Sequence, residues 1–167
     1  MSGDAIGPFD ATRLMGLAGY PGREYKIGVK PAFELFDHTA DIGLRIVAPT
    51  LEGLIRPATD GLYVVIGELA ECGPEETIKL DFAGEDSATL LRDYLAELLR
   101  LFETTQRVIV EPSVTEFTST RLRITARALR IDPDQTIYHR EVKAITYHEL
   151  AISEITGGVE ATVIVDI

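Results

Sequence analysis

The sequence predicts a single α+β domain, because helical and strand-like segments occur without a regular strand–helix–strand repeat. Apolar residues recur at helical spacing over 51–66 and again from about 86 to 103. Apolar and polar residues alternate over 77–83, and much of the chain beyond residue 106 is β-like. The 167 residues are enough for one ordinary domain with a substantial core. We therefore expect mixed or antiparallel sheets with two main helices.

The first elements are a strand over 42–48 and a helix over 51–66. Pro49 ends the strand, and Thr50 stands where a helix is capped. Pro57 lies inside the predicted helix and is expected to kink or interrupt it.

A half-buried strand over 77–83 precedes the second helix, which Asp86 or Ser87 is expected to cap and which is expected to end near Glu103. The buried stripe of that helix is predicted to consist of leucines, one tyrosine and one phenylalanine. Further strands are predicted over 107–111, 121–131, 142–154 and 159–165, with a hairpin turn at 156–158.

Residues 1–31 are expected to be an N-terminal extension, because glycine and proline interrupt them and no period persists. The structured domain is expected to cover 32–167. The N-terminus does not resemble a secretory signal, and no segment approaches the apolar length of a membrane span. Cys72 is the only cysteine, which excludes an internal disulfide. A cytoplasmic location is the simplest expectation.

The net charge of −11 arises from 27 acidic and 16 basic residues. Repulsion of phosphate makes such a domain a poor general binder of nucleic acid. Any role in RNA metabolism is therefore expected to act through another protein. Phosphate-binding glycine loops and a nucleophile elbow are absent from the sequence, and the acidic setting of Cys72 disfavours a reactive thiolate.

The segment FDHTADIGL contains Asp37, His38 and Asp41 within five residues. Carboxylates suit calcium, magnesium or manganese, and a histidine extends the choice towards zinc. Aspartates also cap turns and strand ends, so the segment alone leaves a metal site and a polar turn as alternatives.

At the other end of the chain, VIVDI places the carboxylate of Asp166 beside the terminal carboxylate of Ile167. If 159–165 is a strand, Asp166 lies on the opposite face from Val163 and Val165. These two groups could chelate a cation or simply form a solvated, charged end.

Two further features have both a functional and a structural interpretation. In HREVKAITYH, Lys143 could balance a carboxylate cluster or lie on the surface, and His148 could be a ligand or a hydrogen-bonded structural residue. A basic stripe on the predicted strand 121–131 could be a solvated face or a docking surface for an acidic partner or RNA; it consists of Arg121, Arg123 and Arg127.

Together, DHTADIGL, EVKAITYH and VIVDI resemble the archease family in their order, spacing and terminal placement, and the resemblance covers 33–167. It implies an α+β unit of the strand–helix–strand–strand type with inserted strands. It also implies a non-enzymatic protein that activates a GTP-dependent RNA-splicing ligase, promoting its guanylylation and multiple turnover. RNA would then be contacted only indirectly, and no membrane would be involved.

The resemblance also implies a divalent-cation site, with calcium favoured over magnesium or manganese. Its ligands would be Asp41, Asp166 and Ile167. Four other residues are expected to surround the site or to be linked to activity: Asp37, His38, Lys143 and His148. Pro57 and the N-terminal extension depart from the family pattern.

Two other classes of function remain as alternatives. The chain could be a free-standing metal-dependent hydrolase or phosphotransferase that uses Asp37, His38 and Asp41. It could also be a chaperone-like binding module with an incidental metal. The sequence does not specify an oligomeric state.

Overall fold

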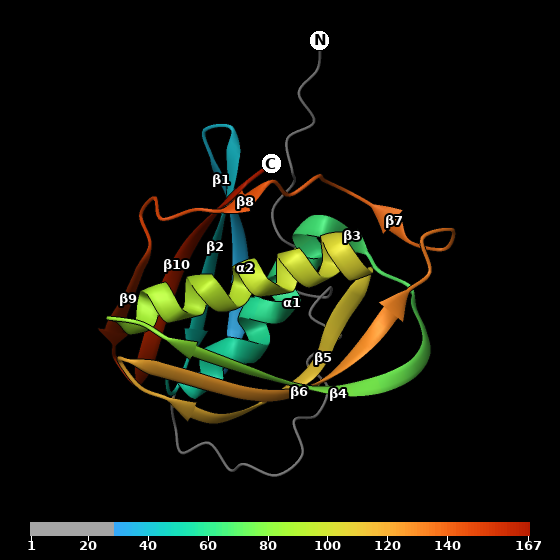
Figure 1. Ribbon diagram of the computed structural model, residues 1–167. Helices are drawn as coiled ribbons and strands as arrows, with labels where there is room; N and C mark the ends of the chain where they lie inside the picture. Colours follow the sequence, from blue (N-terminus) through green and yellow to red (C-terminus); the bar gives the residue numbers. More distant parts are fainter. Residues whose placement is uncertain (1–28) are drawn as a thin grey trace.

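The structure is a computed structural model that describes residues 29–167 (Figure 1). The predicted α+β class is confirmed: two antiparallel sheets enclose two helices. Most of the predicted extension, residues 1–28, lies outside the described residues.

The first sheet has the strand order β1-β2-β10-β8, and β9 pairs with the same edge of β10 as β8 does. Its strands are β1 (Ala32–His38), β2 (Asp41–Ala48), β8 (Ala144–Ile145), β9 (Ala151–Ile155) and β10 (Gly158–Asp166). The last strand of the chain therefore lies in the middle of the sheet, next to a strand from its beginning.

The second sheet has the strand order β4-β6-β5. Its strands are β4 (Glu71–Ala83), β5 (Arg107–Phe117) and β6 (Arg121–Ile131). A separate two-stranded ribbon pairs β3 (Gly67–Glu68) with β7 (Ile137–Tyr138).

The helices α1 (Ile55–Ile66) and α2 (Ser87–Thr105) lie between the two sheets and contact strands of both (Figure 1). The predicted stripe of α2 is confirmed for its leucines and Tyr94, which are almost completely buried, whereas Phe102 at its end is only partly buried. The side chain of Asp86 accepts a hydrogen bond from the Thr89 N–H at 2.8 Å and so caps α2 as predicted.

The prediction that Pro57 interrupts its helix is wrong. A 3₁₀ turn at Glu52–Leu54 precedes α1, and Pro57 is the third residue of the α-helix itself. N–H groups in the first turn have no partner within a helix, so proline costs little there. The side chain of Thr50 accepts a hydrogen bond from the Gly53 N–H at 3.2 Å, which agrees with its predicted capping role.

The predicted strand over 142–154 is also wrong as a continuous element. The chain pairs with β10 at β8, leaves the sheet over 146–150, and returns as β9. A tight β9–β10 turn at 156–157 follows, with Gly157 at φ 83°, where glycine is favoured. Further differences are an unpredicted β1, the unpredicted β3–β7 ribbon, and greater lengths for β4 and β5.

Candidate functional site

The FDHTADIGL segment forms the hairpin between β1 and β2. Its turn consists of Thr39 and Ala40, with Thr39 at φ 53°, and it places His38 opposite Asp41. Side chains of directly opposed residues lie on the same face of a sheet, roughly 5 Å apart at Cβ. The turn is therefore the local reason that His38 and Asp41 are neighbours.

The register between β2 and β10 brings Asp166 next to Asp41. Val165 pairs with Ile42, so one further step along the antiparallel ladder puts Asp166 opposite Asp41. Ile42 and Val165 are buried against the core, and the alternation of a strand turns the two aspartates away from it. Both aspartates are half-buried. The two predicted metal ligands are therefore brought together.

Lys143 and Ile167 complete this group. The Lys143 N–H donates to the Asp166 carbonyl at 2.8 Å, and its Nζ donates to the Ile167 carbonyl at 2.9 Å. In Figure 1 the C-terminus lies beside β8, near the turn of the β1–β2 hairpin. We refer to Asp41, Asp166, Ile167 and Lys143 as the carboxylate cluster.

The remaining predicted residues divide into two groups. Asp37 pairs with Ile42 and therefore faces the other side of the sheet from the aspartates of the carboxylate cluster. His38 and His148 instead lie close together, with ring centroids 5.2 Å apart. The side chain of His148 is 63% accessible, which disfavours the interpretation of this residue as a hydrogen-bonded structural histidine.

The donor set of the carboxylate cluster fits a hard divalent cation. Two carboxylates and a main-chain oxygen are the ligands that calcium, magnesium and manganese prefer. Like charges on directly opposed strand positions destabilise a sheet, and a bound cation would remove that repulsion. The chemistry of the residues therefore agrees with the expected metal, whereas a catalytic nucleophile is not part of the cluster.

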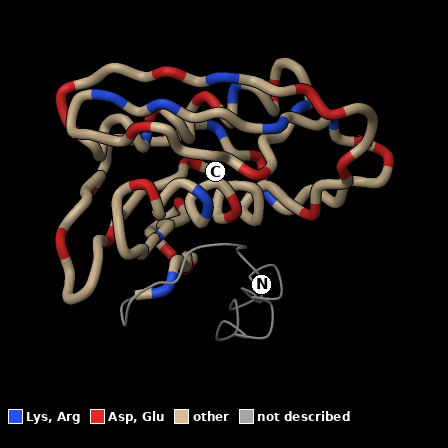
Figure 2. Tube along the Cα trace, turned by 90° about the horizontal axis from the view of Figure 1, so that it is seen from below, with Lys and Arg blue, Asp and Glu red and all other residues tan. Residues whose placement is uncertain are grey.

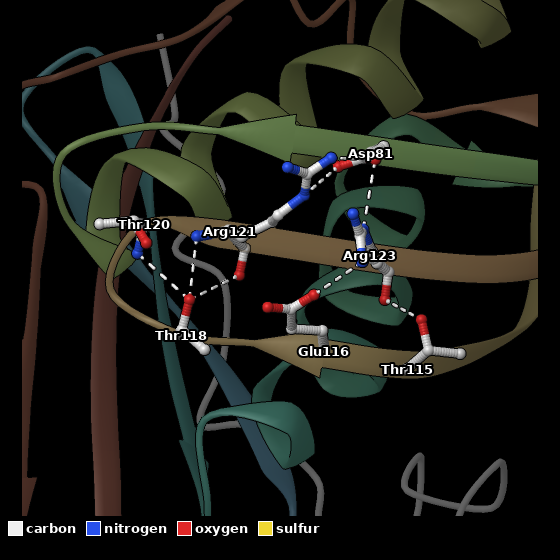
Figure 3. Close-up of polar contacts among 7 residues, drawn as sticks. All are labelled: Asp81, Thr115, Glu116, Thr118, Thr120, Arg121 and Arg123. Carbon is white, nitrogen blue, oxygen red and sulfur yellow. Dashed lines mark hydrogen bonds and ion pairs between the residues drawn. The ribbon is translucent and has the colours of Figure 1, made fainter.

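The basic stripe on β6 is neutralised by its neighbours. Arg121 forms two hydrogen bonds with Asp81, at 2.9 and 2.6 Å, and they hold the pKa of that carboxyl below its usual range (Figure 3). Arg123 contacts Asp81 and Glu116. Arg127 is paired in the same way with Glu75 and Glu111.

Figure 2 shows basic and acidic positions next to one another on these strands. The arrangement favours the solvated-face interpretation over an RNA-docking stripe, because each of these guanidinium groups already has an acidic partner.

Sequence reasoning missed one residue beside the cluster, Glu149. Its carboxylate lies 3.5 Å from His38 Nε2 and 3.6 Å from His148 Nε2. The sequence signal was only its position next to His148, and an acidic residue there is unremarkable without the fold.

The family model described as "Archease protein family (MTH1598/TM1083)" matches residues 33–167. The chain belongs to the archease family. A relative named "Protein archease" from Methanopyrus kandleri is 33% identical over 138 residues, which cover 81% of this chain and 99% of the relative. Another protein of that name, from Pyrococcus abyssi, is 32% identical over 129 residues, or 75% of this chain and 91% of the relative.

Solved archease structures have the same fold. Protein 1598 of Methanobacterium thermoautotrophicum superposes with a TM-score of 0.61 at 29% identity, covering 81% of this chain and 99% of the other. An archease from Thermotoga maritima, described as a possible chaperone, gives a TM-score of 0.58 at 21% identity, covering 80% and 96%. The predicted family and fold class are thus confirmed. Within residues 29–167, no helix of this archease is long and apolar enough to cross a bilayer.

Proposed function

We propose that this archease is a non-enzymatic activator of an RNA-splicing ligase and acts through a divalent cation held by the carboxylate cluster. The observation that supports the proposal best is the meeting of three separate motifs at one end of the first sheet. Asp41 comes from the first motif, Lys143 from the second, and Asp166 with Ile167 from the third. Family membership supports the ligase as the partner, because the resemblance implies that role.

Each residue of the cluster has a proposed part. Asp41 and Asp166 would supply charged oxygen ligands, and Ile167 would supply a main-chain or terminal oxygen. The Lys143 ammonium is bonded to the Ile167 carbonyl, where it fixes the end of the chain and offsets part of the negative charge. When bound, the cation, for which calcium is the first candidate, would supply a concentrated positive charge at the ligase surface.

The net charge of the chain is compatible with a protein partner. A net charge of −11 opposes direct binding of RNA, whereas a protein that acts on the ligase needs no phosphate-binding surface of its own. RNA would accordingly be reached only through the ligase.

The test is guanylylation and RNA joining by the cognate ligase, measured with and without this protein and with varied calcium, magnesium and manganese. Stimulation at substoichiometric amounts is expected. Turnover of a phosphoester by this protein alone would support the metal-dependent hydrolase instead and would contradict the proposal.

Variants connect the stimulation to the carboxylate cluster. Asp41→Ala and Asp166→Ala are expected to abolish stimulation and calorimetric calcium binding together, because each removes a charged ligand. Asp37→Ala is the matched control, since this neighbouring carboxylate faces the other side of the sheet. A tag appended after Ile167 is expected to weaken calcium binding, whereas an N-terminal tag is not. Full stimulation by Asp41→Ala would refute the proposed role of the cation.

A further inference from the structure

A second group of metal-ligating side chains lies beside the carboxylate cluster and is distinct from it. His38, His148 and Glu149 each offer one ligand atom, and these atoms all lie within 4.8 Å of one another. Among residues 29–167, they are the one set of three or more histidine, cysteine or acidic side chains gathered in this way. We refer to them as the histidine cluster.

From this geometry we propose that the histidine cluster is a second metal site, which binds a transition-metal ion of the zinc type. Two imidazoles and one carboxylate form a recognised ligand set for zinc, which takes four ligands and can leave one position open. Imidazole nitrogen favours zinc, copper and nickel over calcium, so this site would differ in selectivity from the carboxylate cluster. The proposal does not depend on the proposed function.

The distances agree with this coordination. Bonds of about 2.0–2.1 Å in a tetrahedron place neighbouring ligand atoms roughly 3.3 Å apart. Glu149 Oε2 lies 3.5 Å from His38 Nε2, and its other oxygen, Oε1, lies 3.6 Å from His148 Nε2. The ligand atoms lie up to 4.8 Å apart, and bringing them to about 3.3 Å requires rotation only of exposed side chains. His148 and Glu149 are 63% and 55% accessible.

His38 is directed towards the cluster by its surroundings. Its side chain is only 21% accessible, and Nε2 is the ring nitrogen that faces Glu149. Nδ1 is buried and has no hydrogen-bond partner among the described residues. Within the described part of the chain, the ring therefore makes its polar contact through Nε2.

The segment that carries His148 and Glu149 is anchored to the sheet where it begins and is closed by an internal turn. The Thr146 N–H donates to the Ile164 carbonyl at 3.0 Å, and the Leu150 N–H donates to the Tyr147 carbonyl at 3.3 Å. Arg92 of α2 lies 4.5 Å over the ring of Tyr147. Ligands placed by such contacts lose less conformational freedom on binding a metal.

The test is zinc binding to tag-free protein carrying Cys72→Ser, which removes the exposed thiol as a competing ligand. Calorimetry is expected to give one equivalent of bound zinc. Cobalt in place of zinc is expected to give the visible absorption of a four-coordinate ion. His148→Ala and Glu149→Gln should each weaken zinc binding by at least about tenfold, because each removes one of three protein ligands.

His139→Ala is the matched control. His139 Nε2 lies 3.7 Å from Glu68 and forms a similar histidine–acid pair, but it has no second histidine beside it. This variant should bind zinc like the parent protein. Circular dichroism establishes that each variant is folded.

Variants of each cluster, tested for binding of the other metal, distinguish the two sites. Asp166→Asn should leave zinc binding within about twofold of the parent, and His148→Ala should leave calcium binding unchanged. An equal loss of zinc affinity in His139→Ala, or no loss in His148→Ala, overturns the proposal. Loss of zinc in Asp166→Asn alone would assign the zinc to the carboxylate cluster and would equally overturn it.

Discussion

At the residue scale, the most constrained polar contact in the core is the pair formed by Thr59 and Tyr94. Both side chains are almost inaccessible, and their hydroxyl oxygens are 2.7 Å apart. Thr59 also donates to the Ile55 carbonyl at 2.7 Å, so Tyr94 acts as the donor in the pair. The two helices are thus joined by a hydrogen bond that water cannot replace.

Removing the Thr59 hydroxyl and removing the Tyr94 hydroxyl should lower the free energy of unfolding by different amounts. Thr59→Val leaves the Tyr94 hydroxyl buried without a partner, which costs about 1–3 kcal/mol of unfolding free energy. Tyr94→Phe leaves Thr59 bonded to Ile55 and should cost about 0.5–1.5 kcal/mol. Urea unfolding measures both values, and the double variant should lose less than their sum. Equal losses in the two single variants would show that the pair is not isolated from water.

The carboxylate cluster gives a second prediction at this scale. Asp41 and Asp166 stand opposite each other, so Asp41→Asn should be neutral or should stabilise the metal-free protein by about 0.2–1 kcal/mol. Added calcium should then raise the thermal midpoint of the parent protein but not that of the variant, because a ligand stabilises only the state that binds it. Thermal unfolding in chelator and in calcium measures both effects. A parent midpoint that is insensitive to calcium would contradict the prediction.

At the element scale, the start of β10 requires a glycine. A Cβ on Gly158 would lie 2.2 Å from the carbonyl oxygen of Ala48 in β2, a backbone atom that cannot rotate away. Val159 pairs with Ala48, so this contact sits at the beginning of the ladder that later brings Asp166 to Asp41. The close approach of β10 to β2 therefore depends on a missing side chain.

Gly158→Ala should destabilise the protein by about 1–3 kcal/mol, because the strands must separate to admit the methyl group. Gly84→Ala is the control: its Cβ meets no backbone atom and only the Leu90 side chain, at 3.1 Å from Cδ2 and 3.4 Å from Cγ. Both changes reduce the entropy of the unfolded chain by a similar amount, so their difference reports the contact in the folded state. Denaturant midpoints for the two variants give this difference, and equal midpoints would be inconsistent with it.

Elements with a strong local pattern could be predicted well, and those whose pairing is interrupted could not. The limits of 121–131 coincide with β6, and the leucine spacing identified α2. The β-rich stretch 142–154 suggested one strand because residues such as Val142, Ile145 and Ile152 suit any extended segment. Its division into β8 and β9 depends on which residues β10 accepts as partners, and that information is not local.

At the scale of the whole molecule, Tyr94 lies where the layers meet. Its hydroxyl contacts Thr59 of α1, and its ring packs edge-on against Phe82 of β4, with centroids 6.3 Å apart. Burial raises the pKa of the Tyr94 phenol far above its ordinary value. Ionisation of this group is therefore coupled to unfolding of the entire domain.

The coupling predicts alkaline destabilisation. Above about pH 10 the unfolded chain releases the Tyr94 proton while the folded protein retains it. The unfolding free energy should therefore fall by about 1.4 kcal/mol for each further pH unit. Below about pH 10 the folded and unfolded protein both retain the Tyr94 proton, so the full contribution of Tyr94 to the unfolding free energy is present.

Urea unfolding between pH 9 and 11.5 measures the slope. Burial also raises the pKa of Tyr63, so Tyr94→Phe should lower the slope by about 1.4 kcal/mol per pH unit and leave the contribution of Tyr63. A slope that is unchanged in Tyr94→Phe would assign the effect to another group.

The sequence by itself determined the α+β class and the two helices, because these follow from local periodicity, and its motifs carried the family resemblance that names the candidate site residues. It could not determine that β10 inserts between β2 and β8, since strand order depends on how distant segments share one core. That order alone makes Asp41 and Asp166 neighbours. The same tertiary arrangement places Glu149 between His38 and His148, whose proximity no spacing along the chain could have shown.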